Sequence, residues 1–358
     1  MAQRILIVNH YWPPTGGPCV QRWVDFSAWL VNNNFQVTVL TPENPGFPYT
    51  DATLLQRVDP KIRVVKVGYK NLVSGTMKKV GSNFVTRFVR GNFFLPDPRL
   101  NWNKHAETFI KEHLNEFDVI ITAGPPHSTH FVGKKFRKQL KWMADFHDYW
   151  TDALYLDQFH RLWPAQWIDK WLEKSILKNA DVVLVHCQTA KSRYQQKTTK
   201  PIHIIPMGFH EKFFSDTSPN IETKVISHVG SFFTFYKSAL PLIKSYIEKG
   251  YIFRQIGPVE EGVWLPEGTE VIPYVPHEKA IAYMCTSEKL LLINHRDFLP
   301  GKLFEYLGSM RPIILVSPEG SDAEKLINEN QHRSREERFN DFSRSGIAKR
   351  LAGIIDVL

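Results

Sequence analysis

Short runs rich in Val, Ile and Leu recur along this chain, and stretches with helical periodicity separate them. Strand-like runs that alternate with helices predict βαβ units and a mostly parallel sheet, whose buried strands are continuous apolar runs. The sequence therefore predicts an α/β protein with two doubly wound sheets. The first series of runs covers residues 4–10, 35–42, 117–124, 141–148, 180–187 and 201–208. The second covers residues 223–231, 251–258, 269–275, 289–295 and 311–317.

The length of 358 residues also favours two domains over one. Polar, linker-like sequence at 196–222 separates the two series of strands. We therefore expect an N-terminal acceptor-side domain at 1–200, a second domain at 201–340, and a C-terminal helix at 341–358 that packs back on the first domain. Ligands of such sheets bind outside the carboxyl ends of the strands, so the cleft between two facing domains is the expected site.

Composition limits the classes of function. Three cysteines without a CxxC pair argue against a disulfide framework or a structural zinc site. The N-terminal apolar run is too short for a signal peptide, and we expect a cytoplasmic protein. The formal charge is 45 − 36 = +9, with an isoelectric point near 9.3. We find no nucleic-acid motif, so phosphates or lipid headgroups are the expected anionic partners.

Two segments do not fit the alternation of strands and helices. Residues 72–102 mix basic side chains, including Lys78 and Lys79, with several phenylalanines. Such a segment can lie on the anionic inner face of a membrane, or its aromatic rings can pack on the domain while its charges are solvated. The charged stretch before the C-terminal helix is expected to be exposed.

Two glycine-containing turns follow predicted strands. Gly16 and Gly17 precede a predicted helix, where the backbone can approach an anion closely, although a plain turn is the commoner meaning of such a pair. Gly230 and Ser231 form the corresponding turn of the second domain, and Lys237 can supply a positive charge to a diphosphate. The G-x-G-x-x-G dinucleotide fingerprint is absent.

Two further stretches carry polar groups at strand ends. His127 follows the strand at 117–124 and can hydrogen-bond a sugar hydroxyl, or it can cap the next helix together with Ser128. Residues 145–152 place three carboxylates around His147, but no second cluster supports a metal site there. We therefore expect that stretch to organise a loop.

The stretch INHRDFLPGKLFEYLGSMRPIILV, residues 293–316, gives the strongest signal. A Pro-Gly turn opens a helix whose first amides favour an anion, and a lysine adds a full charge. A glutamate one turn later can accept hydrogen bonds from vicinal hydroxyls, and an aspartate before the turn can reach another part of the ligand. The alternative is an ordinary capped amphipathic helix. The residues concerned are Asp297, Pro300, Gly301, Lys302, Leu303 and Glu305.

At this point the chain resembles the family-4 glycosyltransferases, which have the GT-B fold of two Rossmann-like domains. The resemblance rests on ILIVNHYWPPTGGPCVQR, VLTPENPG, PPHS, DFHDYWTD, VGSFF and PGKLFEYLGSMRPIILV, in this order over residues 4–327. The last motif is the most specific. The family has an E-x7-E pair, and Asp297 and Glu305 stand at that spacing as D-x7-E.

The resemblance implies that the second domain holds a nucleotide-sugar donor, a substrate rather than a cofactor. It assigns Glu305 to the ribose and Asp297 to the sugar. Lys237 and Lys302, together with the helix amides, would hold the diphosphate, and the segment of Tyr274, Val275 and Pro276 would border the base. From the first domain, Gly16, Gly17 and His127 would face the transferred sugar and the acceptor.

The resemblance also implies a retaining reaction without a metal ion, in which the leaving diphosphate helps to deprotonate the acceptor. Preorganised positive charge would then supply much of the rate. Two departures stand out. Asp297 replaces the usual glutamate, and a strand and helices are missing after Asn330 by comparison with the family. Either the second domain is shortened there or the sequence closes over a gap.

The expected function is transfer of a sugar from a nucleotide-sugar donor to a glycan or lipid-linked acceptor in cell-surface polysaccharide or glycoconjugate synthesis. One alternative is a sugar-nucleotide epimerase of the same fold, which would act on the donor without an acceptor. Another is a non-catalytic sugar-nucleotide or glycan-binding member of the family. A nucleic-acid binder is the weakest alternative, and its sign would be steep salt dependence.

Overall fold

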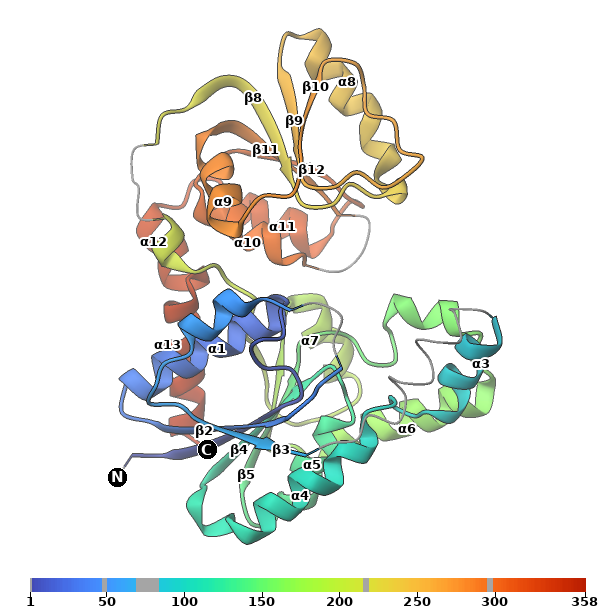
Figure 1. The fold of residues 1–358 in the computed structure, drawn as a ribbon, viewed down its shortest axis with the longest axis vertical. Coiled ribbons are helices and arrows are strands. Elements are labelled where there is room, and N and C mark those ends of the chain that lie inside the picture. The colour runs from blue at the N-terminus through green and yellow to red at the C-terminus, as the bar shows by residue number, and fades with distance from the viewer. Residues whose placement is uncertain (1, 47–49, 69–83, 215–218, 295–298) are drawn as a thin grey trace. The chain divides into compact units, whose positions relative to one another are not determined.

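The computed structural model describes residues 2–46, 50–68, 84–214, 219–294 and 299–358 (Figure 1). The chain divides into two compact units, which are the first and second domains. The first domain comprises Met1–Pro206 with Ala348–Leu358, and the second comprises Met207–Ile347. The division falls after Pro206 rather than at residue 200, because strand β7 still belongs to the first sheet.

The first domain contains a seven-stranded sheet in the order β3-β2-β1-β4-β5-β6-β7, and all its pairings are parallel. Strands β4 and β6 are buried along their whole length, and β1 and β5 are buried after their first residue, as continuous apolar runs predict. The strands are β1 Arg4–Asn9, β2 Gln36–Pro42, β3 Arg63–Val67, β4 Val119–Gly124, β5 Lys141–Phe146, β6 Val182–Val185 and β7 Ile202–Ile204.

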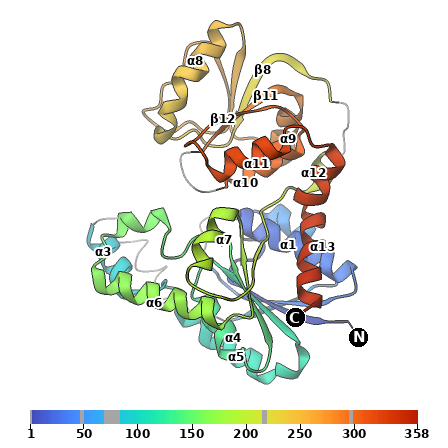
Figure 2. The ribbon, with the colours of Figure 1, turned by 180° about the vertical axis from the view of Figure 1, so that it is seen from behind.

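Helices flank this sheet and return the chain between the parallel strands (Figures 1 and 2). The α-helices are α1 Pro18–Asn32, α3 Phe84–Phe93, α4 Asn103–Glu112, α5 Thr129–Phe136, α6 Trp163–Asn179 and α7 Gln188–Gln195. The 3-10 helices of this domain are η1 Ala52–Arg57, η2 Leu100–Trp102, η3 Leu114–Glu116 and η4 Leu154–Phe159.

A buried ion pair ties α1 to β5 and to the end of β7 in the first domain. The Arg22 guanidinium donates to both carboxylate oxygens of Asp145, at 2.8 and 3.3 Å, and to the Ile205 carbonyl oxygen at 2.8 Å. The indole nitrogen of Trp23 donates to the same carboxylate at 3.0 Å. Neither partner of the ion pair is exposed. Because both charges lie in the core, neither can be removed without leaving the other uncompensated.

The second domain contains a five-stranded sheet in the order β10-β9-β8-β11-β12, again with only parallel pairings. The strands are β8 Glu222–Val229, β9 Ile252–Ile256, β10 Thr269–Ile272, β11 Ser287–Ile293 and β12 Ile313–Val316. The α-helices are α8 Leu240–Glu248, α9 His277–Thr286, α10 Gly301–Gly308, α11 Asp322–Asn330 and α12 Arg335–Phe342, and α13 Arg344–Asp356 begins in this domain and continues in the first. Two 3-10 helices, η5 Glu211–Phe214 and η6 Thr234–Ala239, complete the described elements of this part.

The charged stretch after Asn330 forms helix α12 and the start of α13. Ser334 begins α12 with a capping box, in which its hydroxyl accepts from the Glu337 amide and the Glu337 carboxylate accepts from the Ser334 amide. Helix α13 ends in the first domain, where Leu351 and Ile355 are fully buried. The C-terminal helix expected at residues 341–358 corresponds to α13 in the structure.

Replacing the buried carboxylate is expected to destabilise the first domain. The change Asp145→Asn leaves the Arg22 charge uncompensated, and we expect a loss of about 3 kcal/mol or more of unfolding free energy. Glu116→Gln is the matched control, because the Arg63–Glu116 pair is about half exposed and such pairs contribute roughly 0–1 kcal/mol. Urea unfolding followed by tryptophan fluorescence measures the first domain, since Trp264 is the only tryptophan in the second. An Asp145→Asn midpoint equal to that of the control would contradict this role.

Candidate functional site

The first turn of the second domain brings two stretches of backbone into close contact. Gly230 follows β8 with φ of 111°, and Gly257 follows β9 with φ of 119°. A Cβ atom on Gly257 would lie 2.8 Å from the Gly230 carbonyl oxygen, so a side chain there would force the turn apart. The Gly230 amide donates to the Ile256 carbonyl oxygen at 2.8 Å. The turn is therefore fixed by backbone contacts at the carboxyl ends of β8 and β9.

Lys302 of helix α10 reaches back to this turn. Its ammonium lies 2.7 Å from His228 Nε2 and 3.3 Å from the Val229 carbonyl oxygen. A Cβ atom on Gly230 would lie 3.8 Å from the same ammonium. Burial lowers the pKa of Lys302 to about 8, and the charge of Glu305 partly offsets that effect. The structure thus brings together Lys302 and Gly230, which are distant in the sequence.

The contacts around His228 fix the direction of each hydrogen bond. Gln255 donates from Nε2 to the carbonyl oxygens of Gly230 and Gly257, so its Oε1 is the acceptor for His228 Nδ1 at 2.7 Å. Burial holds the pKa of His228 well below its ordinary value, so the ring is neutral. Its Nε2 therefore accepts from Lys302. An ammonium has three N–H donors, and the described residues use two of them, which leaves one for a ligand.

Glu305 lies one helical turn after Lys302 and is partly buried. Its Oε1 accepts a hydrogen bond from His277 Nε2 at 2.7 Å. Among the residues that the structure describes, no partner holds the second carboxylate oxygen, so this oxygen can accept hydrogen bonds from hydroxyl groups. His277 is the first residue of α9, directly after the segment of Tyr274, Val275 and Pro276. The sequence analysis did not single out His277 or His228, although each stands beside a predicted site segment.

The other residues that were predicted to bind the donor differ in their positions in the second domain. Pro300 caps α10, and Gly301 follows it at the first helical position. The Leu303 amide donates to the Pro300 carbonyl oxygen at 3.0 Å, and its side chain is fully buried, so this residue supports the helix start rather than offering a free donor. Tyr274 is highly exposed at the edge of the domain. Asp297 lies outside the described residues.

Lys237 and Ser231 lie on the same side of the sheet as Gly230, after β8. Lys237 is an exposed residue of η6, and its positive charge adds to the lowering of the Glu260 pKa, which comes mainly from hydrogen bonds to Thr234. The neighbouring Tyr236 ring lies 5.6 Å from the Lys302 ammonium. Lys237 therefore follows a residue whose ring contacts Lys302, but it is itself exposed, whereas Lys302 is partly buried.

In the first domain, His127 lies in the loop that follows β4. Its ring is buried and stacks on the Trp150 indole with a centroid distance of 5.0 Å. Burial lowers the pKa of His127 to about 4, so the ring is neutral at neutral pH. The adjacent Ser128 donates through its amide and its hydroxyl to Asp97, each at 2.8 Å. Ser128 therefore ties the loop to Asp97, and the alternative prediction that its side chain caps α5 is wrong.

The glycine pair of the first domain lies at the neighbouring strand end. Gly17 has φ of 112° and stands immediately before α1, and Gly16 is buried. Strands β1 and β4 pair directly, with Asn9 opposite Ala123, so this turn and the His127 loop lie at the same edge of the sheet. No contact between Gly16 or Gly17 and His127 is among those of the described residues.

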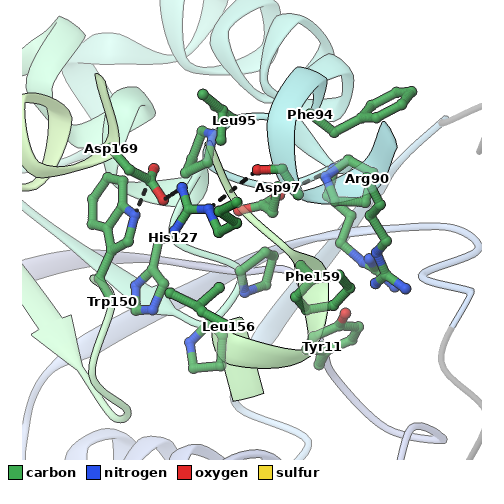
Figure 3. Close-up of a pocket in the computed structure, with 17 residues that line it drawn as sticks. Tyr11, Arg90, Phe94, Leu95, Asp97, His127, Trp150, Leu156, Phe159 and Asp169 are labelled. Atoms are coloured by element: carbon green, nitrogen blue, oxygen red, sulfur yellow. Dashed lines mark hydrogen bonds and ion pairs between the residues drawn. The ribbon is translucent and has the colours of Figure 1, made fainter. Parts of the chain in front are cut away.

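The cavity next to His127 has a volume of about 380 Å³ (Figure 3). Aromatic rings and prolines form most of its wall, together with charged groups from α3, α6 and the loops. On one side of the cavity, Asp169 accepts a hydrogen bond from the Trp150 indole at 3.0 Å and forms an ion pair with Arg161 at 2.5 Å. The lining includes Tyr11, Arg90, Phe94, Arg99, His127, Trp150, Leu156 and Phe159.

The stretch at 145–152 organises its surroundings through separate contacts. Asp145 belongs to the buried ion pair with Arg22, and Asp152 pairs with Lys197 at 3.2 Å. Burial raises the pKa of Asp148 to about 6, and the charge of Asp145 adds to the shift. No group of three potential ligands that could hold a metal ion occurs among the residues that the structure describes. The prediction that catalysis needs no metal stays a prediction.

Comparison with solved structures places this fold among glycosyltransferases. Sucrose-phosphate synthase from Thermosynechococcus elongatus is similar with a TM-score of 0.62 at 14% identity, over 99% of this chain and 98% of that one. A Phytolacca americana enzyme, UGT2, crystallised with UDP-2-fluoro-glucose and pterostilbene, has a TM-score of 0.60 at 12% identity, over 99% of both chains. WaaG, a glycosyltransferase of lipopolysaccharide biosynthesis, has a TM-score of 0.56 at 11% identity, over 98% and 99%.

At these identities the structures establish the fold, which is GT-B with two Rossmann-like domains, as predicted. A comparison with curated proteins gives no match. The family model Glycosyltransferase Family 4 matches residues 20–213, more than half of the chain and most of the first domain. The resemblance predicted from the sequence motifs is thereby confirmed, and the chain belongs to glycosyltransferase family 4.

Proposed function

We propose that this glycosyltransferase is a retaining enzyme that moves a sugar from a nucleotide-sugar donor, bound by the second domain, to a glycan or lipid-linked acceptor bound by the first. The observation that carries the proposal is the ammonium of Lys302. It is partly buried at the carboxyl edge of the sheet beside Gly230, with two donors held by His228 and Val229 and the third unused by the described residues.

The roles follow the order of groups in such a donor. Lys302, with the Gly301 amide at the start of α10, binds the diphosphate, because a helix N-terminus and a lysine both favour an anion. Lys237 and the turn at Gly230 and Ser231 border the same group. Glu305 binds the ribose hydroxyls with the carboxylate oxygen that His277 leaves open. We assign the base to Tyr274, Val275 and Pro276, and the sugar to Asp297.

The chemical step breaks the bond between the anomeric carbon and the diphosphate oxygen and forms a bond from that carbon to the acceptor oxygen, on the same face. The acceptor proton passes to the departing diphosphate, so charge and atoms balance. Lys302 stabilises the negative charge that develops on the leaving group. His127 is neutral at neutral pH and binds a sugar hydroxyl as a hydrogen-bonding partner, not as a cation.

The cavity of the first domain is the proposed acceptor site. Its aromatic rings offer flat apolar faces to a sugar ring, and Arg90 and Arg99 offer positive charge to an anionic acceptor. Several similar structures were crystallised with UDP or UDP-sugars, which supports a nucleotide-sugar donor here. Two of the similar structures also hold DNA, but we propose a glycan or lipid-linked acceptor, at the inner face of a membrane and in cell-surface polysaccharide or glycoconjugate synthesis.

Removing the buried ammonium is expected to lower catalysis strongly. For Lys302→Met we expect kcat/KM to fall on the order of 10²–10³-fold, the usual effect of losing one preorganised donor to developing charge. Lys244→Met, an exposed lysine of α8, is the matched control and should keep the activity of the parent. Sugar transfer is measured by nucleoside diphosphate release with an acceptor. Equal activity of the two variants would exclude the proposed role.

The same lysine predicts how binding depends on pH. In the free protein Lys302 loses its proton as the pH rises through about 8, and the diphosphate binds the protonated form. The dissociation constant for a nucleoside diphosphate should therefore be constant below that pH and rise above it, approaching about tenfold per pH unit. Calorimetry at several pH values measures this. Lys302→Met should bind weakly with a flat profile, and a sloping profile in that variant would assign the titration to another group.

The roles of Glu305 and Lys302 can be distinguished by comparing the binding of two ligands. Glu305→Ala should weaken the binding of a nucleoside diphosphate by about ten- to a hundredfold, because a hydrogen-bonded charged group is lost from the ribose. It should leave the binding of inorganic pyrophosphate, which has no ribose, almost unchanged. Lys302→Met should weaken both ligands. A Glu305→Ala variant that loses both ligands equally would show that the carboxylate supports the site as a whole rather than the ribose.

A further inference from the structure

Helix α6 presents three exposed tryptophans, one every fourth residue. Trp163, Trp167 and Trp171 are 78%, 64% and 57% exposed, whereas Trp23 and Trp142 in the same domain are fully buried. Residues spaced by four lie on one face of a helix. A row of large aromatic side chains in solvent on one helix face is characteristic of an interaction surface.

The basic and the acidic side chains of α6 lie on different faces of the helix. Its lysines, Lys170, Lys174 and Lys178, are all exposed, and at about 100° per residue they share a sector of roughly 100° with the tryptophans. The two acids of the helix are buried and turned inward. Asp169 binds Trp150 and Arg161, and Glu173 binds Thr151 and Lys197. Among the described residues, none of the three lysines forms an ion pair.

The tryptophan–lysine face therefore consists of Trp163, Trp167, Lys170, Trp171, Lys174 and Lys178. Helix α3 lies beside α6 (Figures 1 and 2), and the Asn92 side chain accepts from the Leu162 amide at 2.7 Å. This neighbour adds exposed Phe84 and Phe93, and it contains no acidic residue. The acids that flank α6 in the sequence are exposed Asp157 of η4 before it and partly buried Asp181 after it, and Asp181 accepts from the Trp142 amide at 2.9 Å.

We infer that the tryptophan–lysine face docks on an anionic lipid bilayer, with the indole rings at the level of the headgroups and the lysines on the lipid phosphates. Tryptophan is favoured at that depth, and each lysine near an anionic surface strengthens binding. None of the helices in the described part of the chain has the length and apolar character needed to span a membrane. The bilayer contact is therefore a surface contact.

Charge decides between a bilayer and a second copy of the chain. In a two-fold dimer the same face meets itself, so three lysines would oppose three lysines. An anionic bilayer neutralises the same charges. The sequence pattern predicts membrane contact for residues 72–102, of which 72–83 lie outside the described residues and 84–93 form α3. Helix α6 lies outside that range and adds a second surface beside α3.

The inference deepens the proposed function, because a lipid-linked acceptor is reached at a membrane. Arg90 of α3, Phe159 of η4 and Asp169 of α6 line the proposed acceptor cavity, so the elements that meet the bilayer also build that cavity. Docking itself is measured as binding to lipid. A protein that does not bind lipid would therefore contradict the docking proposal alone, because sugar transfer and donor binding are measured separately.

The test is co-sedimentation of the protein with vesicles of phosphatidylcholine alone or mixed with phosphatidylglycerol. The parent should bind the mixed vesicles far more strongly than the neutral ones. A triple variant, Lys170→Gln, Lys174→Gln and Lys178→Gln, should lose roughly fivefold in affinity per lysine. A second triple variant, Trp163→Ala, Trp167→Ala and Trp171→Ala, should lose on the order of tenfold or more.

The matched control variants carry similar substitutions on the surface of the second domain. The triple variant Lys244→Gln, Lys279→Gln and Lys325→Gln removes the same charge, and Trp264→Ala removes a tryptophan that is 85% exposed. Both controls should bind vesicles like the parent, and all variants should bind pyrophosphate like the parent. Equal losses in face variants and controls would overturn the inference. So would a parent that ignores anionic vesicles, or a dimer that dissociates when the three tryptophans are replaced.

Discussion

Every pairing between the named strands of the two sheets is parallel, and this constraint decides where chemistry can occur. A parallel sheet collects the carboxyl ends of its strands, and the loops after them, along one edge. In the second domain this edge unites the Gly230 turn with Lys302 and Glu305 of α10. In the first it unites the glycine pair before α1 with the loop of His127. Each domain thus forms its own part of the proposed site from loops at one edge of its sheet.

Burial of charge distinguishes the groups that stabilise the fold from those that are open to a ligand. Arg22 and Asp145 neutralise one another in the core of the first domain, where neither side chain is exposed to a ligand. Lys302 is partly buried, and its hydrogen-bond partners are a neutral imidazole and a carbonyl oxygen, so only the nearby charge of Glu305 offsets its positive charge. A buried cation without a paired anion is costly, and an anionic ligand would remove that cost. This contrast is why we assign Lys302, rather than Arg22, to the diphosphate.

The sequence predicts the alternation of strands and helices well, because continuous apolar runs and glycine turns are local signals. It also predicts that Lys302 and Glu305 lie on one helix after Pro300, because that helix start is a local signal, and their roles in donor binding stay a prediction. It does not predict that His228 and Gln255 orient Lys302, since that network joins three elements distant in the chain. The row of tryptophans on α6 has a helical period that also suits a buried face, and only the structure shows that these rings are exposed while Asp169 and Glu173 pair inward.

The most direct test of the account is a crystal structure of the protein with a bound nucleoside diphosphate. The account predicts a phosphate oxygen within about 3 Å of Lys302 Nζ, and ribose hydroxyls on the Glu305 carboxylate. The bond from Lys302 to His228 should persist, because it uses a different donor of the ammonium. A diphosphate bound away from α10, with Lys302 in contact with only His228 and Val229, would contradict the assignment of the donor site.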